Sequence, residues 1–206
     1  MPSFRALLKL GGGGGPGPSP SFSQAHVLLA LLAIGDSKMI GRQALAGEIG
    51  LGEGVVRTIL KKLTASKYVE TIASGCRLTH LGRQVHDELR RVLSQVVFLD
   101  ARSLSVGTTQ ASVRVKGGGR RLGNGIAQRD AAILVGAAGA TTYTIRAGKF
   151  AIPGGSRNCE RDFPSPAWKK LRSEFQLREG DAVVLCGADD TQRAKVGAVS
   201  ASLTLL

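Results

Sequence analysis

Cysteine and histidine are scarce in this chain, and their spacing argues against several kinds of site. The three cysteines, Cys76, Cys159 and Cys186, lie far apart and form no CxxC pair. This pattern favours a reducing cytosol over a disulfide framework. The three histidines show no metal-ligand spacing, and none of them follows Ala101. We therefore predict no metal site, no cofactor and no catalytic residues of the Ser/His/Asp or Cys/His kind.

Long apolar runs are also missing. The longest, such as VLLALLAI from Val27, fall well short of the roughly 20 residues that span a bilayer. The first ten residues, MPSFRALLKL, have the basic and apolar character of a signal peptide, but Lys9 interrupts their apolar run. We therefore expect a cytoplasmic protein without a membrane partner. The segment GGGGGPGPSP at 11–20 favours a flexible leader over residues 1–20, with folded structure beginning near Ser21.

Acidic residues are few relative to basic ones. The chain has 28 Lys and Arg against 15 Asp and Glu, a net charge of +13, so part of its surface will attract a polyanion. Residues 1–100 hold 12 basic and 7 acidic residues, a net +5, whereas residues 101–206 hold 16 and 8, a net +8. The more basic second half therefore needs an explanation of its own. With 43% hydrophobic residues, the 206-residue chain can fill one large core or two small ones.

Residues 21–100 carry the pattern of a small helical domain. The stretch QAHVLLALLAI is apolar nearly all round and predicts a central helix surrounded by others. Leu45 and Ile49 mark the inner face of a short helix, which Gly50 can end in a left-handed conformation. A second helix is expected from about Gly52. Its inner stripe has the spacing i, i+3, i+4, i+7 and consists of Val56, Ile59, Leu60 and Leu63.

A hairpin and a long helix complete this predicted domain. The segments YVETIA and CRLT, joined at Ser74-Gly75, predict two short antiparallel strands. Thr79 is placed to cap a following helix, which would reach about 28 Å if it continued from His80 to Phe98. Its apolar stripe predicts the seam of a homodimer. The alternative is that the stripe only packs on its own domain.

The order helix, short helix, turn, helix, hairpin, helix is typical of a winged helix-turn-helix. The stretch IGRQALAGEIGLGEGVVRTILKKL followed by GCRLTHLG resembles the winged helix of bacterial and archaeal transcriptional regulators, including the central glycolytic gene regulator of Firmicutes. The whole chain resembles archaeal two-part proteins that join such a winged helix to a domain of unknown function, 4443. The stretch QRDAAILVGAAGATTY carries this second resemblance.

The outer face of the second short helix is the predicted DNA-reading surface. Arg57 is the best candidate for base readout, because a guanidinium can donate twice to guanine. Lys61, Lys62, Arg42 and Gln43 are expected to hold phosphates, and Glu53 is expected to interact with the helix dipole rather than with cytosine. The full predicted DNA-binding set is Arg42, Gln43, Glu53, Gly54, Arg57, Thr58, Lys61, Lys62 and Arg77.

The sequence from 101 to 206 alternates between strand and helix patterns. Strands are predicted at 111–117 and 181–188, and a hairpin at 140–153 turning through Ala147-Gly148. Helices are predicted at 124–139, with Gly139 near the end, at 165–177 and at 191–206. This mixture indicates an α/β or α+β domain, and it leaves the strand order open.

Candidate effector- or anion-binding residues in this half lie in three clusters. Glycines beside Lys116, Arg120 and Arg121 could cradle a phosphate or carboxylate, although a flexible basic loop is the favoured explanation. Arg129 and Asp130 are adjacent and therefore point to different faces; they could line a pocket or anchor the fold. Asp189 and Asp190 follow the buried strand at a position where α/β sites collect, but an Asp before a helix is more often its N-cap.

These features predict an α+β or α/β protein with an N-terminal winged helix-turn-helix at 21–100 and a C-terminal mixed α/β domain at 101–206. The predicted function is a DNA-binding transcriptional regulator and not an enzyme. Its expected partners are double-stranded DNA, a second copy of the chain and a small anionic effector. Two alternatives stay open. The second half could be an enzyme for a phosphorylated or nucleotide-like substrate that the winged helix only localises, or both halves could bind RNA.

Overall fold

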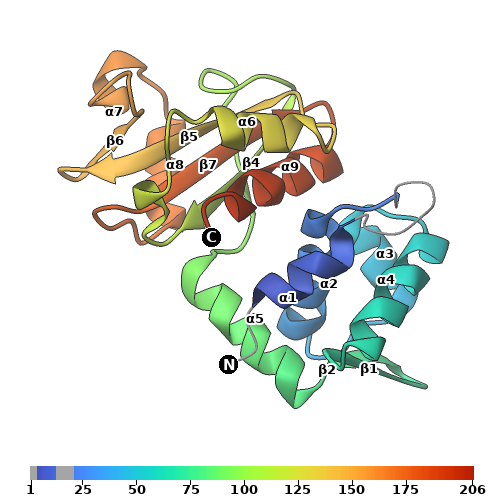
Figure 1. Cartoon of the computed structure of the whole chain (residues 1–206). Helices are drawn as coiled ribbons and strands as arrows, with labels where there is room; N and C mark the ends of the chain where they lie inside the picture. The colour runs from blue at the N-terminus through green and yellow to red at the C-terminus, as the bar shows by residue number, and fades with distance from the viewer. Residues whose placement is uncertain (1–3, 13–20) are drawn as a thin grey trace. The chain divides into compact units, whose positions relative to one another are not determined.

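The computed structural model describes residues 4–12 and 21–206, and the chain divides into two compact units (Figure 1). Unit 1 comprises Met1–Arg90 and unit 2 comprises Arg91–Leu206. The predicted boundary after residue 100 therefore lies too late, because the chain from Arg91 onward already packs with unit 2. Mixed helix and strand content, with a helical region preceding a sheet, agrees with the predicted α+β class.

Unit 1 follows the element order that the sequence predicts from Ser21 onward. Three helices precede a two-stranded antiparallel hairpin, and a fourth helix follows it. A further short helix and a 3-10 turn lie nearer the N-terminus. The elements are α1 (Phe4–Leu8), η1 (Lys9–Gly11), α2 (Gln24–Asp36), α3 (Arg42–Ile49), α4 (Glu53–Ala65), β1 (Val69–Ile72), β2 (Gly75–Leu78) and α5 (His80–Val92).

Residues 4–12 are more ordered than the sequence predicts. Leu7 of α1 is fully buried, and η1 lies so close to α2 that a Cβ at Gly11 would meet the backbone of Gln24 at 2.5 Å. Lys62 Nζ also donates to the Leu10 carbonyl at 2.9 Å. The expectation that folded structure begins only near Ser21 is therefore wrong, because the apolar residues before the glycines pack against α2. Residues 1–3 and 13–20 of the predicted leader lie outside the described residues.

The turn between α3 and α4 forms as its glycines predict. Gly50 ends α3 in the left-handed conformation at φ 70°, and Gly52 precedes α4. The predicted inner stripe of α4 is buried. The hairpin gains a third segment, since Ile40 pairs with Cys76 through two backbone hydrogen bonds of 2.9 and 3.1 Å. These contacts hold the hairpin beside the start of α3.

Helix α5 begins as predicted and ends early. The Gly82 amide donates to the Thr79 hydroxyl at 3.0 Å, which confirms the cap. The helix stops at Val92 and not at Phe98, because the chain beyond it pairs with a strand of unit 2. Lys116 N donates to the Val92 carbonyl at 2.8 Å, and Leu93 forms an antiparallel bridge with Val115. The helix is therefore shorter than the predicted length to Phe98, and the homodimer stays a prediction.

Unit 2 is built on a five-stranded antiparallel sheet in the order β3-β4-β7-β5-β6. The strands are β3 (Val97–Phe98), β4 (Thr109–Val115), β5 (Gly139–Arg146), β6 (Lys149–Ala151) and β7 (Ala182–Ala188). Its helical segments are η2 (Gly118–Arg120), α6 (Ile126–Ile133), α7 (Cys159–Asp162), α8 (Ala167–Glu174) and α9 (Thr191–Leu203). Every residue of the central strand β7 is buried, as the run DAVVLCGA predicts.

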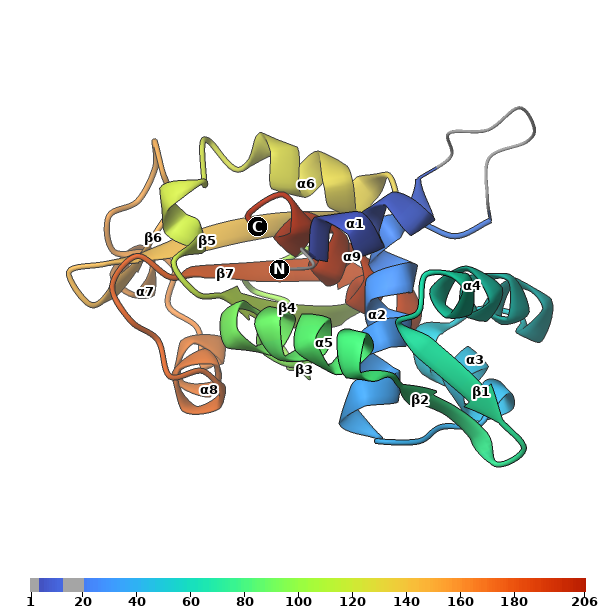
Figure 2. The ribbon, with the colours of Figure 1, turned by 60° about the horizontal axis from the view of Figure 1, so that its bottom comes forward.

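Helices cover both faces of this sheet. Figures 1 and 2 show α6 and α9 on one face and α8 on the other. On the α9 side, Gly197 lies so close to β7 that a Cβ there would meet Cys186 Sγ at 2.6 Å. On the α8 side, the Trp168 ring lies 5.0 Å from Tyr143 and 4.8 Å from Phe150, measured between centroids. These aromatic rings form the centre of the core on that side.

Several predicted elements of unit 2 are confirmed, and one boundary is corrected. The hairpin turns through Ala147 and Gly148, which both have positive φ, at 48° and 71°; this is the backbone that a two-residue hairpin turn requires. Helix α6 ends at Ile133, so Gly139 does not belong to the helix and is the first residue of β5. Strand β3 and helix α7 are too short to give a period in the sequence.

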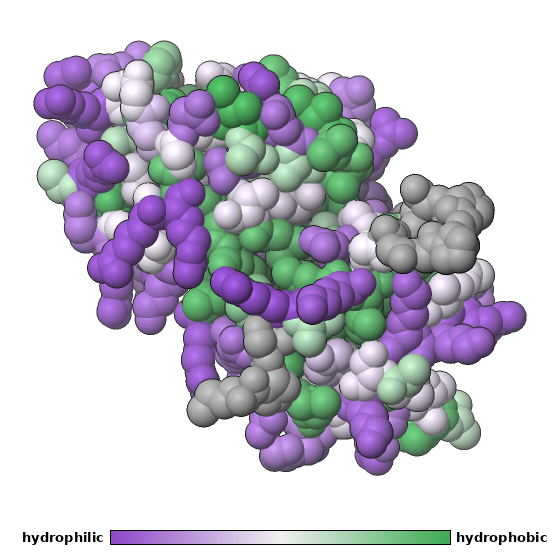
Figure 3. All heavy atoms as spheres, in the orientation of Figure 1, coloured by the Kyte–Doolittle hydropathy of each residue, from purple (hydrophilic) through white to green (hydrophobic). Residues whose placement is uncertain are grey.

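Some large apolar side chains stay exposed in unit 2. Figure 3 shows apolar residues on the outer surface over α6. The exposed ones there are Ile126, Ile133 and Leu134. The three cysteines of the chain, in contrast, are free thiols and all buried.

Candidate functional site

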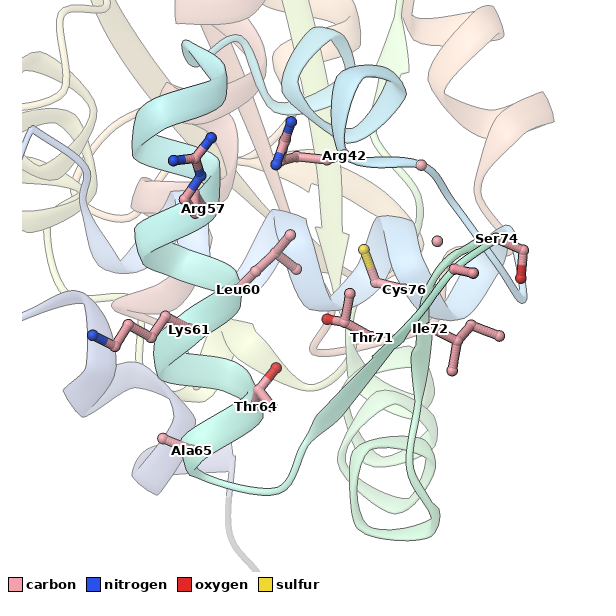
Figure 4. Close-up of a pocket in the computed structure, with 13 residues that line it drawn as sticks. Arg42, Arg57, Leu60, Lys61, Thr64, Ala65, Thr71, Ile72, Ser74 and Cys76 are labelled. Carbon is pink, nitrogen blue, oxygen red and sulfur yellow. The ribbon is translucent and has the colours of Figure 1, made fainter.

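Unit 1 has a groove between α4 and the β1-β2 hairpin. It has a volume of about 790 Å³. Figure 4 shows α4 along one side and the hairpin along the other, with the start of α3 at one end. We call it the α4-hairpin groove. Its lining residues are Gly41, Arg42, Arg57, Leu60, Lys61, Thr64, Ala65, Thr71, Ile72, Ala73, Ser74, Gly75 and Cys76.

The charge of this groove is entirely positive among the described residues that line it. Arg42, Arg57 and Lys61 line it, and no acidic residue does. Arg57 and Lys61 are exposed on α4 one turn apart, and neither forms an ion pair with any residue that the structure describes. Their charges are therefore available to a ligand of opposite sign.

The floor of the groove is apolar and preformed. Leu60 is 8% exposed and Cys76 is 1% exposed. Burial raises the pKa of the Cys76 thiol, so it stays neutral near pH 7 and acts as part of the apolar wall. Thr64 and Thr71 add hydroxyl groups from the two sides. The groove thus combines a fixed floor with cations and hydroxyls on its rim.

Four of the charged side chains in the predicted DNA-binding set already contact other groups within the protein. Arg42 Nε donates to Glu53 Oε2 at 3.1 Å in an exposed ion pair, and Glu53 lies in the first turn of α4. Lys62 lies 5.2 Å from the centre of the Phe22 ring, besides donating to the Leu10 carbonyl, so it is not on the open surface as predicted. On the hairpin, Arg77 Nε donates to Glu70 at 2.8 Å.

The other predicted residues lie on the exposed surface of α3 and α4. Gln43, Gly54 and Thr58 are all exposed, and a Cβ at Gly54 would meet nothing within 4 Å. The Thr58 hydroxyl donates to the Gly54 carbonyl at 3.3 Å. The structure therefore brings Arg42, Arg57 and Lys61 to one groove. It also adds hairpin residues such as Thr71 and Ser74, whose only signal in the sequence was their place beside the turn.

In unit 2, the glycine loop near Lys116 is occupied by the protein itself. The Gly117 amide donates to the Asp181 carboxylate at 2.9 Å, and the Gly119 amide donates to the Gly180 carbonyl at 2.9 Å. These amides cannot also cradle a phosphate, so the predicted cradle is wrong in that respect. Lys116, Arg120 and Arg121 are exposed, and Arg121 Nη1 donates to the Leu205 carbonyl at 3.1 Å.

Of the two residue pairs Arg129-Asp130 and Asp189-Asp190, three side chains have partners within the protein. Arg129 Nη2 and Asp130 Oδ1 form an exposed ion pair at 3.1 Å, so the two side chains do not diverge as expected. Asp190 accepts from the Arg193 amide at 2.8 Å and caps α9, which supports the alternative weighed for that residue. Asp189 is exposed beside it. None of these four groups lines either cavity described here.

A second cavity, of about 540 Å³, opens where β5 and β6 meet the loop after β6. Arg146 and Arg157 line it, together with the glycine pair Gly154-Gly155 and the Thr144 side chain. Both arginines are exposed, and neither forms an ion pair with another described residue. We call it the β5-β6 cavity. Sequence reasoning missed it, because its two arginines are 11 positions apart and flank no recognisable motif.

Two further findings concern the parts of the chain that the structure covers. Within residues 4–12 and 21–206, no helix is long and apolar enough to cross a membrane. Over the same residues, no three His, Cys, Asp or Glu side chains gather as potential ligands of a metal ion.

Comparison with known proteins follows the division into two units. Residues 106–205 match the family of a domain of unknown function, DUF4443. Residues 27–84 match the family described as PH0730-like, N-terminal domain. The predicted resemblance of the second half to domain 4443 is thereby confirmed. No curated protein matches the chain.

A solved structure shares the architecture of both units. It is the hypothetical protein PH0730 from Pyrococcus horikoshii OT3, which is 25% identical over 87% of this chain and 90% of that chain, with a TM-score of 0.68. This likeness supports a common two-part fold. The name of that protein states no activity, and the resemblance to the glycolytic gene regulator stays a prediction.

Proposed function

We propose that unit 1 is a winged helix-turn-helix that binds double-stranded DNA, and that the protein is a transcriptional regulator and not an enzyme. The observation that carries the proposal is the pair of cations Arg57 and Lys61, which form no ion pair within the described part of the chain and lie on the wall of a groove that no described acidic residue lines. In this assignment α4 is the recognition helix, and the hairpin formed by β1 and β2 is the wing.

The dimensions and chemistry of α4 suit the major groove. A helix about 10–12 Å across fits there, and its N-terminal residues meet base edges. Arg57 lies in the second turn of α4, where it can donate twice to guanine O6 and N7. Lys61 lies one turn further and is placed to hold a phosphate. In this assignment Arg42 and Gln43, at the start of α3, contact phosphates of the DNA backbone.

The test begins by selecting a bound sequence from a random duplex library with the full chain. Binding of that duplex is then measured by fluorescence anisotropy. We expect Arg57→Ala to weaken binding by about 10- to 100-fold and to relax the preference at one base pair. Lys61→Ala should weaken binding to all sequences. It should also reduce the slope of log affinity against log salt concentration by about 1, which corresponds to the loss of one phosphate contact.

The matched control is Arg161→Ala, which removes an exposed arginine of unit 2. It should bind the selected duplex like the wild type. Equal DNA affinity of the wild type, Arg57→Ala and Lys61→Ala would contradict the recognition-helix assignment. A preference for structured RNA over the selected duplex would instead support the RNA-binding alternative.

We further propose that the β5-β6 cavity binds a small anionic effector. Its volume of about 540 Å³ lies within the roughly 300–1,000 Å³ of small-molecule sites. The unpaired guanidinium groups of Arg146 and Arg157 suit a phosphate or carboxylate, because such groups bind bidentately to arginine. A ligand there would change DNA affinity only if it bound one state of the protein better than the other.

We expect inorganic phosphate or a phosphorylated metabolite from a screening panel to raise the melting temperature of the wild type. The Arg146→Ala, Arg157→Ala double variant should show no such shift, whereas Lys116→Ala should behave like the wild type. The readout is Trp168 fluorescence during heating, because this single tryptophan lies in the core of unit 2. Equal shifts for the wild type and the double variant would exclude the cavity as the anion site.

A further inference from the structure

One end of the unit 2 sheet brings together cations that lie far apart in the sequence. Val115 of β4 and Thr144 of β5 both pair with Ala182 of β7, so the ends of β4 and β5 lie beside the start of β7. Segment η2 lies there too, since the Gly119 amide donates to the Gly180 carbonyl. Figures 1 and 2 show η2, the β5-β6 turn and the start of β7 at this same end. We call its cations the sheet-end patch, which consists of Lys116, Arg120, Arg146, Lys149, Arg157 and Arg178.

The six side chains of the sheet-end patch are all exposed. Arg157 belongs to the patch because it lines the β5-β6 cavity together with Arg146. None of the six forms an ion pair or a side-chain hydrogen bond with another residue that the structure describes. The patch therefore presents six positive charges to the solvent.

The acidic residues of the neighbouring segments are bound to other partners. The Glu179 carboxylate accepts from the Ala147 and Gly148 amides of the β5-β6 turn, at 3.2 and 3.4 Å. Three further carboxylates form ion pairs of 2.7 Å, which are Asp181 with Arg114, Glu160 with Arg172 and Asp162 with Arg161. These acids therefore leave most of the positive charge of the patch uncancelled.

The patch explains why the second half of the chain is the more basic one. Residues 101–206 carry a net charge of +8, and six unpaired cations at one end of the sheet make up most of that excess. Cations that converge from separate loops attract a partner with many negative charges more strongly than they attract a single ion. The partner that fits this surface is a polyanion.

We propose that the sheet-end patch holds the phosphate backbone of duplex DNA without reading its sequence. The choice of DNA rests on the proposed function, because a chain that binds DNA through unit 1 meets this polyanion in every complex. Four neighbouring strands, from β4 to β6, span about 14 Å at about 4.8 Å per strand. A duplex of that length carries about eight phosphate charges, so the patch and the duplex are comparable in charge density.

The surroundings of the patch favour duplex DNA over two other polyanions. Tyr143 and Phe150, on the strands that carry Arg146 and Lys149, are only 3% and 0% exposed. Unpaired RNA bases therefore cannot stack on these rings, as they do in many sites for single-stranded RNA. None of the exposed large apolar side chains of the described residues lies in the patch segments, which leaves nothing to insert into a lipid surface.

The test compares charge-removal variants of the full chain in their binding to a labelled duplex of unselected sequence. Fluorescence anisotropy is measured over a series of salt concentrations. Arg120→Ala combined with Arg178→Ala removes two cations of the patch and keeps both arginines of the β5-β6 cavity. We expect the slope of log affinity against log salt concentration to fall by about 2, and the affinity at about 0.1 M salt to fall by about 10- to 60-fold.

Two control variants separate the patch from net charge and from folding. Arg102→Ala combined with Arg193→Ala removes two exposed, ion-paired arginines near the opposite end of the sheet. It lowers the net charge by the same amount and should bind within about twofold of the wild type. Arg120→Lys combined with Arg178→Lys keeps the charge and should keep the wild-type slope, because a phosphate accepts either cation. A loss that came from a disturbed fold would also appear as a lower melting temperature by Trp168 fluorescence.

The outcomes distinguish this proposal from that for unit 1. The alanine pair at 120 and 178 should weaken the selected and the unselected duplex by the same factor, whereas Arg57→Ala should change the preference between them. If the Arg57 and Lys61 variants bind like the wild type and the alanine pair does not, the function proposed for unit 1 fails and the patch assignment stands.

Three results would overturn the patch assignment. The first is an unchanged salt slope in the alanine pair at 120 and 178. The second is an equal loss of affinity in the variant at 102 and 193, which would mean that only the net charge matters. The third is a loss confined to a structured RNA hairpin with duplex DNA binding unchanged, which would assign the patch to RNA.

Discussion

An Asp181→Ala variant is expected to lose about 3–5 kcal/mol of the unfolding free energy of unit 2. Asp181 is only 2% exposed, and its carboxylate accepts from Arg114 Nε at 2.7 Å. It also accepts from the backbone amides of Gly117 and Arg178, both at 2.9 Å. Alanine removes the acceptor of all three donors. A largely buried arginine is then left without its counter-charge, which is the costly way to break such a pair.

Urea unfolding followed by Trp168 fluorescence measures this loss, because the single tryptophan lies in the core of unit 2. The matched control is Asp189→Ala, which removes an exposed carboxylate eight residues further on. The control should change the unfolding free energy by less than about 0.5 kcal/mol. Similar losses for both variants would show that the Asp181 carboxylate does not organise the ends of β4 and β7.

A Gly82→Ala variant is expected to destabilise unit 1 by about 2–3 kcal/mol. Gly82 is a buried residue in the first turn of α5, where the helix meets β1 and β2. A Cβ at this position would lie 2.0 Å from the Tyr68 carbonyl oxygen and 3.3 Å from Leu78 Cβ. The first of these atoms is backbone, so it cannot rotate away. The helix and the hairpin must separate to accept the methyl group.

The unfolding of unit 1 is measured by hydrogen exchange of the α5 and β1 amides, because unit 1 contains no tryptophan. Gly47→Ala is the matched control, since a Cβ at this exposed helical position would meet nothing within 4 Å. It should stabilise unit 1 by about 0.5–1 kcal/mol through the higher helix propensity of alanine. Equal exchange rates in the Gly82→Ala variant and the wild type would contradict the close approach.

Local patterns predicted the elements of unit 1 well, because each depends on residues close in sequence. The stripe from Val56 to Leu63 and the left-handed Gly50 identify α4 and its turn without knowledge of the rest. The end of α5 could not be predicted in this way. Its apolar period continues past Val92, and only the pairing of Leu93 with Val115 shows that the chain leaves the helix there.

In the sheet of unit 2, local sequence patterns predicted single strands and not their order. The buried run of β7 was recognisable, since seven consecutive buried residues need a central position. Its neighbours β4 and β5 were recognisable as strands. The order β3-β4-β7-β5-β6 was not, because it depends on which strands pair across long separations.

The candidate site was predictable in its centre and not at its edges. Helical periodicity alone places Arg57 and Lys61 on the outer face of α4. The engagement of Lys62 with Leu10 depends on a segment 52 positions away. Likewise, the pairing of Arg42 with Glu53 joins two helices across a turn. Such contacts decide which cations are available, and they are visible only in the folded chain.

The labelling rates of the buried cysteine thiols can report how often each unit opens. Burial raises the pKa of the Cys76 and Cys159 thiols and raises that of Cys186 to about 12. A thiol reagent therefore reacts with them only when the surrounding structure opens. Because Cys76 belongs to unit 1 and the other two to unit 2, the labelling rates of the unmodified protein report the opening of the two units separately.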